Sequence, residues 1–442
     1  MCSNGSPAAP DHNEPETDDS RPAHLASEPS QDDSAQEGPI PLQVAPILPT
    51  FQHALTAPAL PCALPAPSFT QEADSSGAPA DATALPSPHE AITSLNLEWI
   101  AGAGPLAEVV IASRVRVARN LRGFRFPLAA RPAELEAVRN RVNEAARAST
   151  FTADFASLNL ADLSTIQLHT LVEKHLLSPL LAHMVTGGGG GRSLLLGPYG
   201  ILSGMVNEED HLRLQCLLSG LETARGWRLL SQFDDALEST LDFAFSSHLG
   251  YMTACPSNVG TGLRASVMLH LPAIALAHAI EAVKAQIVSQ VGLAVRGLYG
   301  EGTAVHGNLL QISNQISLGP REEDIEARVR AVAERVVEQE MGARARLRRD
   351  FSVQLGDKLW RALGILRHAR VIAAAEALEL LSMVRLGIEL EILPPISRKR
   401  LNALLVAIRP ATLQVLMGQV SNPLQADILR AQRIRAELGE EA

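Results

Sequence analysis

The sequence predicts an α+β protein. It should have an antiparallel or mixed sheet flanked by helices, a disordered N-terminal tail and an all-helical C-terminal domain. Segments of strand character and segments of helix character are segregated along the chain, which argues against an alternating βαβ arrangement. After about residue 351 only helical patterns remain, punctuated by glycine and proline. We therefore expect three parts, at 1–96, 97–345 and 346–442.

The first part differs from the rest in composition. Residues 1–96 hold 16 of the 28 prolines, and residues 1–90 carry 13 acidic groups against one basic group, Arg21. Such a segment cannot bury enough apolar surface to offset the entropy lost on ordering, so we expect it to be disordered. Its more apolar stretch, 41–64, is interpreted as a linker in preference to a docking segment.

Strand and helix patterns follow one another from about residue 97. The run 109–117 is predicted to be a strand, and 133–147 and 160–177 are predicted to be helices. The glycine run Gly187–Gly191 predicts a loop, and two strands are expected after it, at 193–196 and 201–206.

The next segment, 207–218, is expected to be a helix with Asn207 as its N-cap and acids in its first turn. The remaining expected elements are a helix at 271–290, strands at 293–298 and 309–318, and a long charged helix at 322–348.

Charge and composition limit the kind of partner. The chain has a formal charge of −10 and residues 1–90 have −12, so residues 91–442 carry about +2. A near-neutral folded part argues against nucleic acid, which requires a broad basic face. We expect neither a membrane span nor a signal peptide, because no apolar stretch of about 18 residues and no leader pattern occurs. The four cysteines lack metal-ligand spacing, and a reducing cytoplasm is the expected location.

Lysine is scarce, with four residues against 34 arginines. Genome composition is the ordinary cause of such an excess. The scarcity is still informative, since no G-x-x-x-x-G-K-[ST] loop and no kinase set of glycine-rich loop, strand lysine and H-R-D occurs. A nucleotide, if bound, would have its phosphates held by arginine.

The segment 251–266 (YMTACPSNVGTGLRAS) is the most informative motif. Cys255 precedes a proline turn, a glycine-rich bend follows, and Arg264 begins the next element. This order offers a thiolate, backbone N–H groups and a guanidinium to one small volume, which suits a polyphosphate beside a cationic substrate. The alternative is an ordinary turn with a buried cysteine.

Three further clusters carry charge. Arg114 and Arg116 are two positions apart on a predicted strand, so both should point to one face, toward either carboxylates of the protein or a triphosphate. The run Asn207–Arg213 contains three acids, which form either a solvated helix start or carboxylates placed as a base or near Mg²⁺. The loop from Arg296 to Glu301 is flanked by glycines, which permit a ligand to approach the backbone closely, unless it is a plain turn.

Together these segments supply five arginines, two glutamates and a cysteine: Arg114, Arg116, Arg213, Arg264, Arg296, Glu209, Glu301 and Cys255. Arginines neutralise a transferring phosphoryl group with fixed donors. Two carboxylates would suit a guanidinium substrate, which is a poor nucleophile until it is oriented and deprotonated.

The segments SRVRVARN, NEEDHLRLQ, GYMTACPSNVGTGLRASVMLHLP, and RGLYGEG followed by GNLLQISNQISLG closely resemble the ATP:guanido phosphotransferase (phosphagen kinase) family. The resemblance covers about 107–340 well and extends more loosely to about 438. It implies the family's glutamine-synthetase-like fold, an antiparallel sheet flanked by helices. It also implies the activity of the bacterial members, which transfer the γ-phosphoryl group of ATP to arginine side chains of proteins.

Residue roles follow from the resemblance. It implies that Glu209 and Glu301 orient and deprotonate the acceptor guanidinium and that Cys255 lies beside it. ATP is expected with Mg²⁺, without direct side-chain ligation of the metal, although Glu208 could contact it through water. The residues implied to hold ATP are Ser113, Arg114, Arg116, His175, Arg213, Arg264, Ala265, Ser266, Val267, Met268, Arg296, Gly297 and Gly300.

The resemblance also implies partners: protein substrates, an activator protein, a Clp-type ATPase or protease that receives the marked proteins, and a second copy in a homodimer. The family's C-terminal phosphoarginine-sensing pattern, Arg-Asp-x-x-Arg-Ala, is matched here by Asp427, Arg430 and Ala431, but Ala426 replaces its first arginine. Ala112 and Ser257 are milder departures from the family pattern. Two rival functions are a kinase of a free guanidino metabolite, such as arginine, and a silent adaptor that binds phosphoarginine proteins.

Overall fold

The computed structural model describes residues 92–93, 96–296, 307–418 and 420–439. The expected tail therefore lies almost entirely outside the described residues, although Ile92 is fully buried. Three expected site residues, Gly297, Gly300 and Glu301, also lie outside them.

An eight-stranded sheet forms the centre of the part at 97–345, and every neighbouring pair of strands is antiparallel. The predicted α+β class with an antiparallel sheet is confirmed. In spatial order the strands are β2 (Ala156–Asn159), β3 (Ser193–Leu196), β4 (Leu202–Val206), β5 (Leu212–Ser219), β1 (Val110–Arg119), β8 (Leu263–His270), β10 (Leu309–Asn314) and β9 (Leu293–Arg296).

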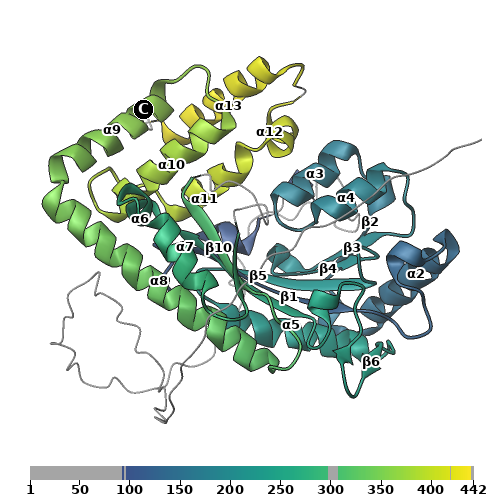
Figure 1. Cartoon of the computed structure of the whole chain (residues 1–442). Coiled ribbons are helices and arrows are strands. Elements are labelled where there is room, and N and C mark those ends of the chain that lie inside the picture. The colour runs from purple at the N-terminus through teal and green to yellow at the C-terminus, as the bar shows by residue number, and fades with distance from the viewer. Residues whose placement is uncertain (1–91, 94–95, 297–306, 419, 440–442) are drawn as a thin grey trace, which may run out of the picture. The chain divides into compact units, whose positions relative to one another are not determined.

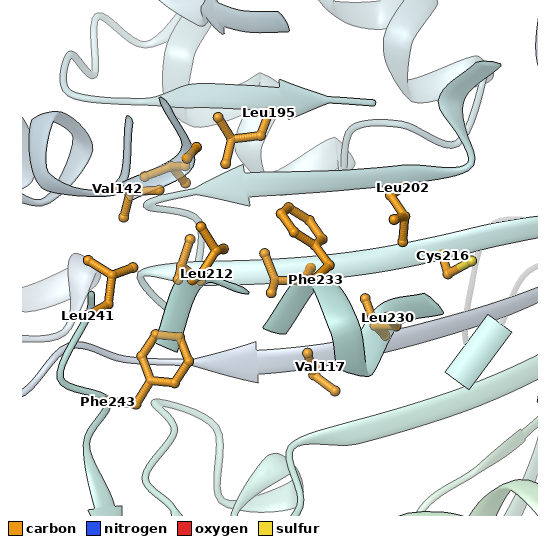
Figure 2. Close-up of a cluster of buried hydrophobic side chains, with 14 of the residues drawn as sticks. Val117, Val142, Leu195, Leu202, Leu212, Cys216, Leu230, Phe233, Leu241 and Phe243 are labelled. Atoms are coloured by element: carbon orange, nitrogen blue, oxygen red, sulfur yellow. The ribbon is translucent and has the colours of Figure 1, made fainter. Parts of the chain in front are cut away.

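Apolar side chains cover one face of this sheet. On the central strands β1 and β5, Val115, Val117, Leu214 and Cys216 are all at most 1% exposed. They pack beneath α5 (Thr223–Glu238), whose Phe233 lies at the centre of the cluster (Figure 2). Because side chains alternate along a strand, burial of these residues directs the residues between them to the opposite face.

A long helix, α8 (Glu322–Asp350), covers the other half of the same face and packs on β8 and β10 (Figure 1). Its buried residues include Ile325, Val329, Val332 and Val336, which have the spacing of one helical face. Three acids lie in its first turn and two arginines in its last, an order that complements the helix dipole. The predicted charged helix at 322–348 is confirmed.

The helix predicted at 207–218 is wrong. Residues 207–211 form a tight turn, in which Asn207 has φ of 59° and its N–H donates to the carbonyl of His211, and β5 follows. The acids resemble the first turn of a helix. The side chains after them, however, point alternately to the two faces of the sheet, which is typical of a strand. This strand, β5, pairs with β4 and β1.

The other strands and helices predicted between residues 97 and 345 are present, most of them with different boundaries, whereas β2, α4 (Pro179–Thr186) and α5 were not predicted. The helix predicted at 271–290 is divided at His278, whose φ is 56°. The helix predicted at 160–177 begins as a 3₁₀ turn and becomes α-helical only later. The helices are α2 (Pro132–Ala148), α3 (Thr165–Glu173), α4 (Pro179–Thr186), α6 (Pro272–Leu276) and α7 (Ile280–Val288).

The C-terminal part is helical, as predicted, and has its own apolar core. Polar contacts join it to β8 and to α3: the Ser382 hydroxyl lies 2.8 Å from Nε2 of His270, and the Glu173 carboxylate accepts from the N–H groups of Ala411 and Thr412. None of the described helices is both long and apolar enough to cross a membrane. The helices are α9 (Ser352–His368), α10 (Ala374–Glu389), α11 (Arg398–Ala407), α12 (Pro410–Met417) and α13 (Pro423–Leu438).

Candidate active site

The strand register places four of the expected arginines on one face of the sheet. Arg116 of β1 lies opposite Arg264 of β8, and Arg213 of β5 lies opposite Ala118. Directly paired residues project to the same face, as do residues two apart on one strand. Arg114, Arg116, Arg213 and Arg264 therefore share the face opposite α5 and α8, and each is half-buried.

Two further strand pairings place the fifth arginine, Arg296, on the same face. Arg296 of β9 pairs with Gln311 of β10, and Gln311 pairs with Met268 of β8. Met268 is four residues from Arg264 and so projects to the same side. Arginines from four different strands thus meet on one surface, which we call the arginine face: Arg114, Arg116, Arg213, Arg264 and Arg296.

Within the described part of the chain, neither Arg114 nor Arg116 of the arginine face is paired with a carboxylate. Glu208 is buried and forms an ion pair of 2.6 Å with Arg213. Arg114 donates instead to the neutral amide oxygen of Gln215, at 2.9 Å from Nε. Nε of Arg116 is buried and has no hydrogen-bond partner within the described part of the chain.

The pKa values of Arg114 and Arg116 reflect this lack of a paired carboxylate. Burial, and after it the charge of Arg213, lowers the pKa of Arg114 to about 9. Burial and the charges of Arg114, Arg213 and Arg264 place the pKa of Arg116 well below its usual value. When folding lowers the pKa of a base, its charge costs stability at every pH below the folded-state pKa, and for Arg114 neutral pH lies in that range. A bound polyanion would remove this cost.

Other expected nucleotide contacts fall into two groups. Ser266 lies on the arginine face, opposite Arg114. Ala265 and Val267 project to the opposite face and are fully buried in the core, so only their backbone remains near the arginines. The Ser113 hydroxyl donates to the carbonyl of Gly220 and accepts from the N–H of Glu222, so it fastens β1 to the loop before α5.

His175 lies at the edge of the arginine face with a φ of 61°. Its carbonyl accepts from the Gln215 amide, and its ring meets Trp99 edge-on at 5.4 Å. Burial, followed by the charges of Arg114 and Arg409, lowers the pKa of His175 to about 3, so the ring is neutral at any working pH. With its neighbours it encloses a cavity of about 30 Å³, lined by Trp99, Ala112, Arg114, His175, Leu217, Ser266, Met268 and Gln311.

Asp210 joins the turn 207–211 to the loop that carries Cys255, which we call the cysteine loop. One of its carboxylate oxygens accepts from Nδ2 of Asn120 at 2.6 Å and from the N–H of Ala254 at 2.7 Å. Asn120 also donates to the carbonyl of Met252 and accepts from the N–H of His211. These bonds place Glu209 and Cys255 on adjoining loops next to the arginine face.

Glu208 and Glu209 differ in environment although they are neighbours in sequence. Burial disfavours the charge of Glu208, but the charge and hydrogen bond of Arg213 outweigh it and lower its pKa. Glu209 is half-buried, and burial together with the charge of Asp210 raises its pKa. Glu208 is therefore a fixed anion, whereas Glu209 is a carboxylate whose proton affinity is increased.

Cys255 is partly exposed at the start of a 3₁₀ turn, with its sulfur 3.0 Å from the Ser257 hydroxyl. The Ser317 hydroxyl holds this loop in place, because it lies 2.9 Å from the carbonyl oxygens of both Ser257 and Val259. Gly260 has φ of 110° and packs against the backbone of Ser317, where a Cβ would collide. Glycine is required there to let the loop that carries Cys255 pack closely on the segment after β10.

The described residues contain no group of three or more His, Cys, Asp or Glu side chains that could hold a metal ion. Beside the arginine face, Oε1 of Glu208 is buried and has no hydrogen-bond partner among the described residues.

The C-terminal residues suggested for phosphoarginine sensing are engaged in the fold. The Arg430 side chain is 4% exposed; its guanidinium donates to the carbonyls of Ile408 and Ile372 and is paired with Asp427. Ala431 is buried in the helical core. In this arrangement Arg430 holds three segments of the helical part together.

The sheet gathers arginines on the face opposite α5 and α8, next to one loop that bears acids and one that bears a cysteine. This arrangement is typical of a protein that transfers phosphoryl groups. Residues 137–343 match the model of the ATP:guanido phosphotransferase C-terminal catalytic domain. Residues 352–442 match that of the Protein-arginine kinase McsB C-terminal domain. The chain belongs to the ATP:guanido phosphotransferase family and, within it, to the protein-arginine kinases.

Relatives support this over almost their whole length. The chain is 47% identical over 349 residues to the protein-arginine kinase of Moorella thermoacetica, which covers 77% of this chain and 98% of that protein. It is 45% identical to the protein-arginine kinase of Symbiobacterium thermophilum, with coverage of 79% and 99%. Among solved structures it is similar to the duplicated taurocyamine kinase of Schistosoma mansoni, at 28% identity and a TM-score of 0.49, over 54% of this chain and 34% of that one.

Sequence reasoning missed four residues of the site: Asn120, Asp210, His211 and Gln215. Two signals were available, because Asn120 ends the SRVRVARN motif and the other three lie within NEEDHLRLQ. Their partners are about 90 to 100 residues away in the chain, as for Asn120 with Asp210 and Arg114 with Gln215. Only strand pairing reveals such contacts.

The lack of a paired carboxylate predicts an unusual response to Arg116→Gln. Without nucleotide the free energy of unfolding should stay the same or rise, because mutual repulsion is relieved. ATP affinity should fall at least tenfold, as expected for loss of a charge-assisted contact. Urea unfolding and calorimetric ATP titration measure the two quantities. Strong destabilisation with unchanged ATP affinity would show instead that Arg116 is a structural cation.

His211 predicts a pH dependence of stability. The N–H of Leu121 donates to its Nδ1, so Nε2 carries the proton and donates to the carbonyl of Arg125. Burial lowers the pKa of His211 to about 4, against about 6.5 in the unfolded chain. As pH falls from 6.5 to about 4, His211 is protonated in the unfolded chain but not in the folded protein. The free energy of unfolding should therefore fall by up to about 1.4 kcal/mol per pH unit over this range.

The check is urea unfolding between pH 8 and 4. His211→Asn, which retains an acceptor near Nδ1, should flatten the slope of the unfolding free energy between pH 6.5 and 4. His248→Asn, at an exposed histidine, is the matched control and should leave the slope unchanged. An unaltered slope in His211→Asn would contradict this assignment.

Proposed function

We propose that this kinase transfers the γ-phosphoryl group of ATP to arginine side chains of proteins, with the arginine face holding the triphosphate. The observation that carries the proposal is the gathering of guanidinium groups on that face, where Arg114 and Arg116 are half-buried and are paired with no carboxylate among the described residues. Fixed guanidinium groups neutralise the oxygens of a transferring phosphoryl group without reorganisation. Ser266 and the backbone of Ala265 and Val267 would flank the phosphates, and His175 and Met268 would border the nucleoside.

On the acceptor side we assign Glu209 and Glu301 to the incoming guanidinium. A nitrogen of that guanidinium attacks the γ-phosphorus, an N–P bond forms, and the bond to the bridging oxygen breaks to release ADP. The nitrogen loses a proton, for which Glu209 is the acceptor that we propose, because its pKa is raised. Cys255 lies on the adjoining loop, where its sulfur would border the same guanidinium.

Mg²⁺ is included in the proposal as a companion of ATP. It would screen the phosphate charge during transfer. Glu208 would meet it through water, which agrees with its unpartnered, buried Oε1 and its lowered pKa. We also propose a cytoplasmic location, an activator protein, a homodimer and delivery of the products to a Clp-type protease, all on the basis of family resemblance alone.

Glu209→Gln tests the acceptor assignment. It should reduce phosphoryl transfer at least a hundredfold, the scale of a general base, while ATP affinity changes less than threefold. Transfer is measured with γ-labelled ATP and an unfolded protein acceptor. Glu376→Gln, an exposed glutamate of α10, is the control and should keep full activity. Near-normal turnover in Glu209→Gln would reject the base assignment.

The same assay identifies the product. A phosphoramidate on arginine should be lost in acid and survive mild base, unlike a phosphoserine ester. If label entered free arginine and not protein, the metabolite kinase would be the better description. If no ATP turnover occurred with any acceptor, the silent adaptor would be favoured.

A further inference from the structure

An open groove of about 640 Å³ lies beside the cysteine loop and plays no part in the mechanism above. It is lined on one side by the end of α5 and the segment after it, and on the other by the hairpin of β6 (Phe245–Ser246) and β7 (Gly250–Tyr251), marked by β6 in Figure 1. The lining side chains used below are Arg122, Glu238, Asp242, Phe243, Phe245 and Tyr251.

Aromatic rings form one wall of the groove. Tyr251 meets Phe245 edge-on at 5.1 Å and Phe243 at 6.4 Å. Its other support is Arg119, whose guanidinium lies 3.5 Å from the centre of the Tyr251 ring and is paired with Asp234. The Tyr251 ring is therefore held in place by Arg119. Phe245 nevertheless remains 52% exposed, which is unusual for a large apolar side chain.

The charge of the groove is negative. Among its lining side chains Arg122 is paired with Asp242 at 3.6 Å, so these two charges offset each other. Glu238 is exposed and forms no ion pair within the described residues. A carboxylate next to a fixed aromatic wall is the arrangement that recognises an organic cation, through its charge and through the ring face.

The groove lies near the acceptor side of the site, at the end of β1, where Leu121 bridges to Phe243 and Tyr251 bridges to Gly260. Tyr251 lines it, and Cys255 follows four residues later, which is a span of about 14 Å at full extension. Between them the carbonyl of Met252 accepts from Asn120, the residue that also holds Asp210 beside Glu209. A polypeptide whose arginine enters the site would therefore have residues within about four positions of that arginine over the groove.

We propose that this groove is a subsite for a second basic side chain of the protein substrate, within about four residues of the arginine that is phosphorylated. The inference rests on the proposed function, because it takes the acceptor to lie at Glu209 and Cys255. Glu238 supplies the charge, and Phe245 and Tyr251 supply the ring faces. The groove thus acts on substrate choice and not on phosphoryl transfer itself.

The test uses the full chain with peptides that contain one arginine and either lysine or alanine at a position one to four residues away. Lysine is chosen because it adds a cation without a second guanidinium acceptor. At the best position lysine should lower KM about three- to tenfold with unchanged kcat. This advantage should shrink as salt rises, since both charges are exposed.

Glu238→Gln should abolish the lysine advantage and leave the alanine peptide unaffected, whereas the control Glu376→Gln should keep the advantage. Phe245→Leu should reduce it, because the apolar surface is retained but the ring face is lost. If lysine does not lower KM in the natural chain, or if Glu238→Gln keeps the advantage, the subsite is refuted. If leucine lowers KM as much as lysine, the groove is an apolar docking site and the proposal is wrong.

These outcomes are separate from those of the catalytic proposal. Transfer to the alanine peptide that depends on Glu209 would support the catalytic assignment even when the lysine effect is absent. Loss of that dependence, with a lysine advantage that still requires Glu238, would retain the subsite and reject the base.

Discussion

The central constraint on this protein is the positive charge that its sheet gathers on one face. Apolar side chains beneath α5 and α8 fix the direction of each strand, and that direction forces Arg114, Arg116 and Arg213 to the opposite side. Burial and mutual repulsion lower the pKa of Arg114 and of Arg116, so a bound anion would stabilise this face. The fold positions the guanidinium groups, and the ligand would supply the opposite charge.

The acceptor side is arranged by a different kind of contact. Asn120 and Asp210 are buried polar groups whose hydrogen bonds join β1, the turn 207–211 and the cysteine loop. Because an unsatisfied buried polar group is costly, each of these bonds helps to hold the others. The loops that bear Glu209 and Cys255 are thus fixed relative to the arginine face, as a reaction between two positioned reactants requires.

Much of this could be predicted from the sequence. The spacing of Arg114 and Arg116 predicted a shared face, and the structure confirms that geometry. The α+β class, the antiparallel sheet and the charged helix α8 were also predicted correctly. Motif resemblance identified the family, and the comparisons confirm it. The roles assigned to Glu209, Cys255 and the nucleotide contacts remain predictions.

The failures have a common physical cause. The segment 207–218 was misjudged because three acids next to Asn207 resemble a helix start, while the pairing that makes β5 a strand is with β1 and β4, far away in sequence. Gln215 and Asp210 were missed for the same reason. Local patterns specify local structure well, but the partners of a buried polar group are set by the register of distant strands.

The most direct test of the account is a calorimetric titration of the nucleotide-free protein with inorganic triphosphate, followed over a range of salt. If the arginine face is a polyanion site, triphosphate should bind, raise the free energy of unfolding with its concentration, and lose affinity steeply as salt rises. Failure of triphosphate to bind or to stabilise the protein, at low salt, would contradict the central claim.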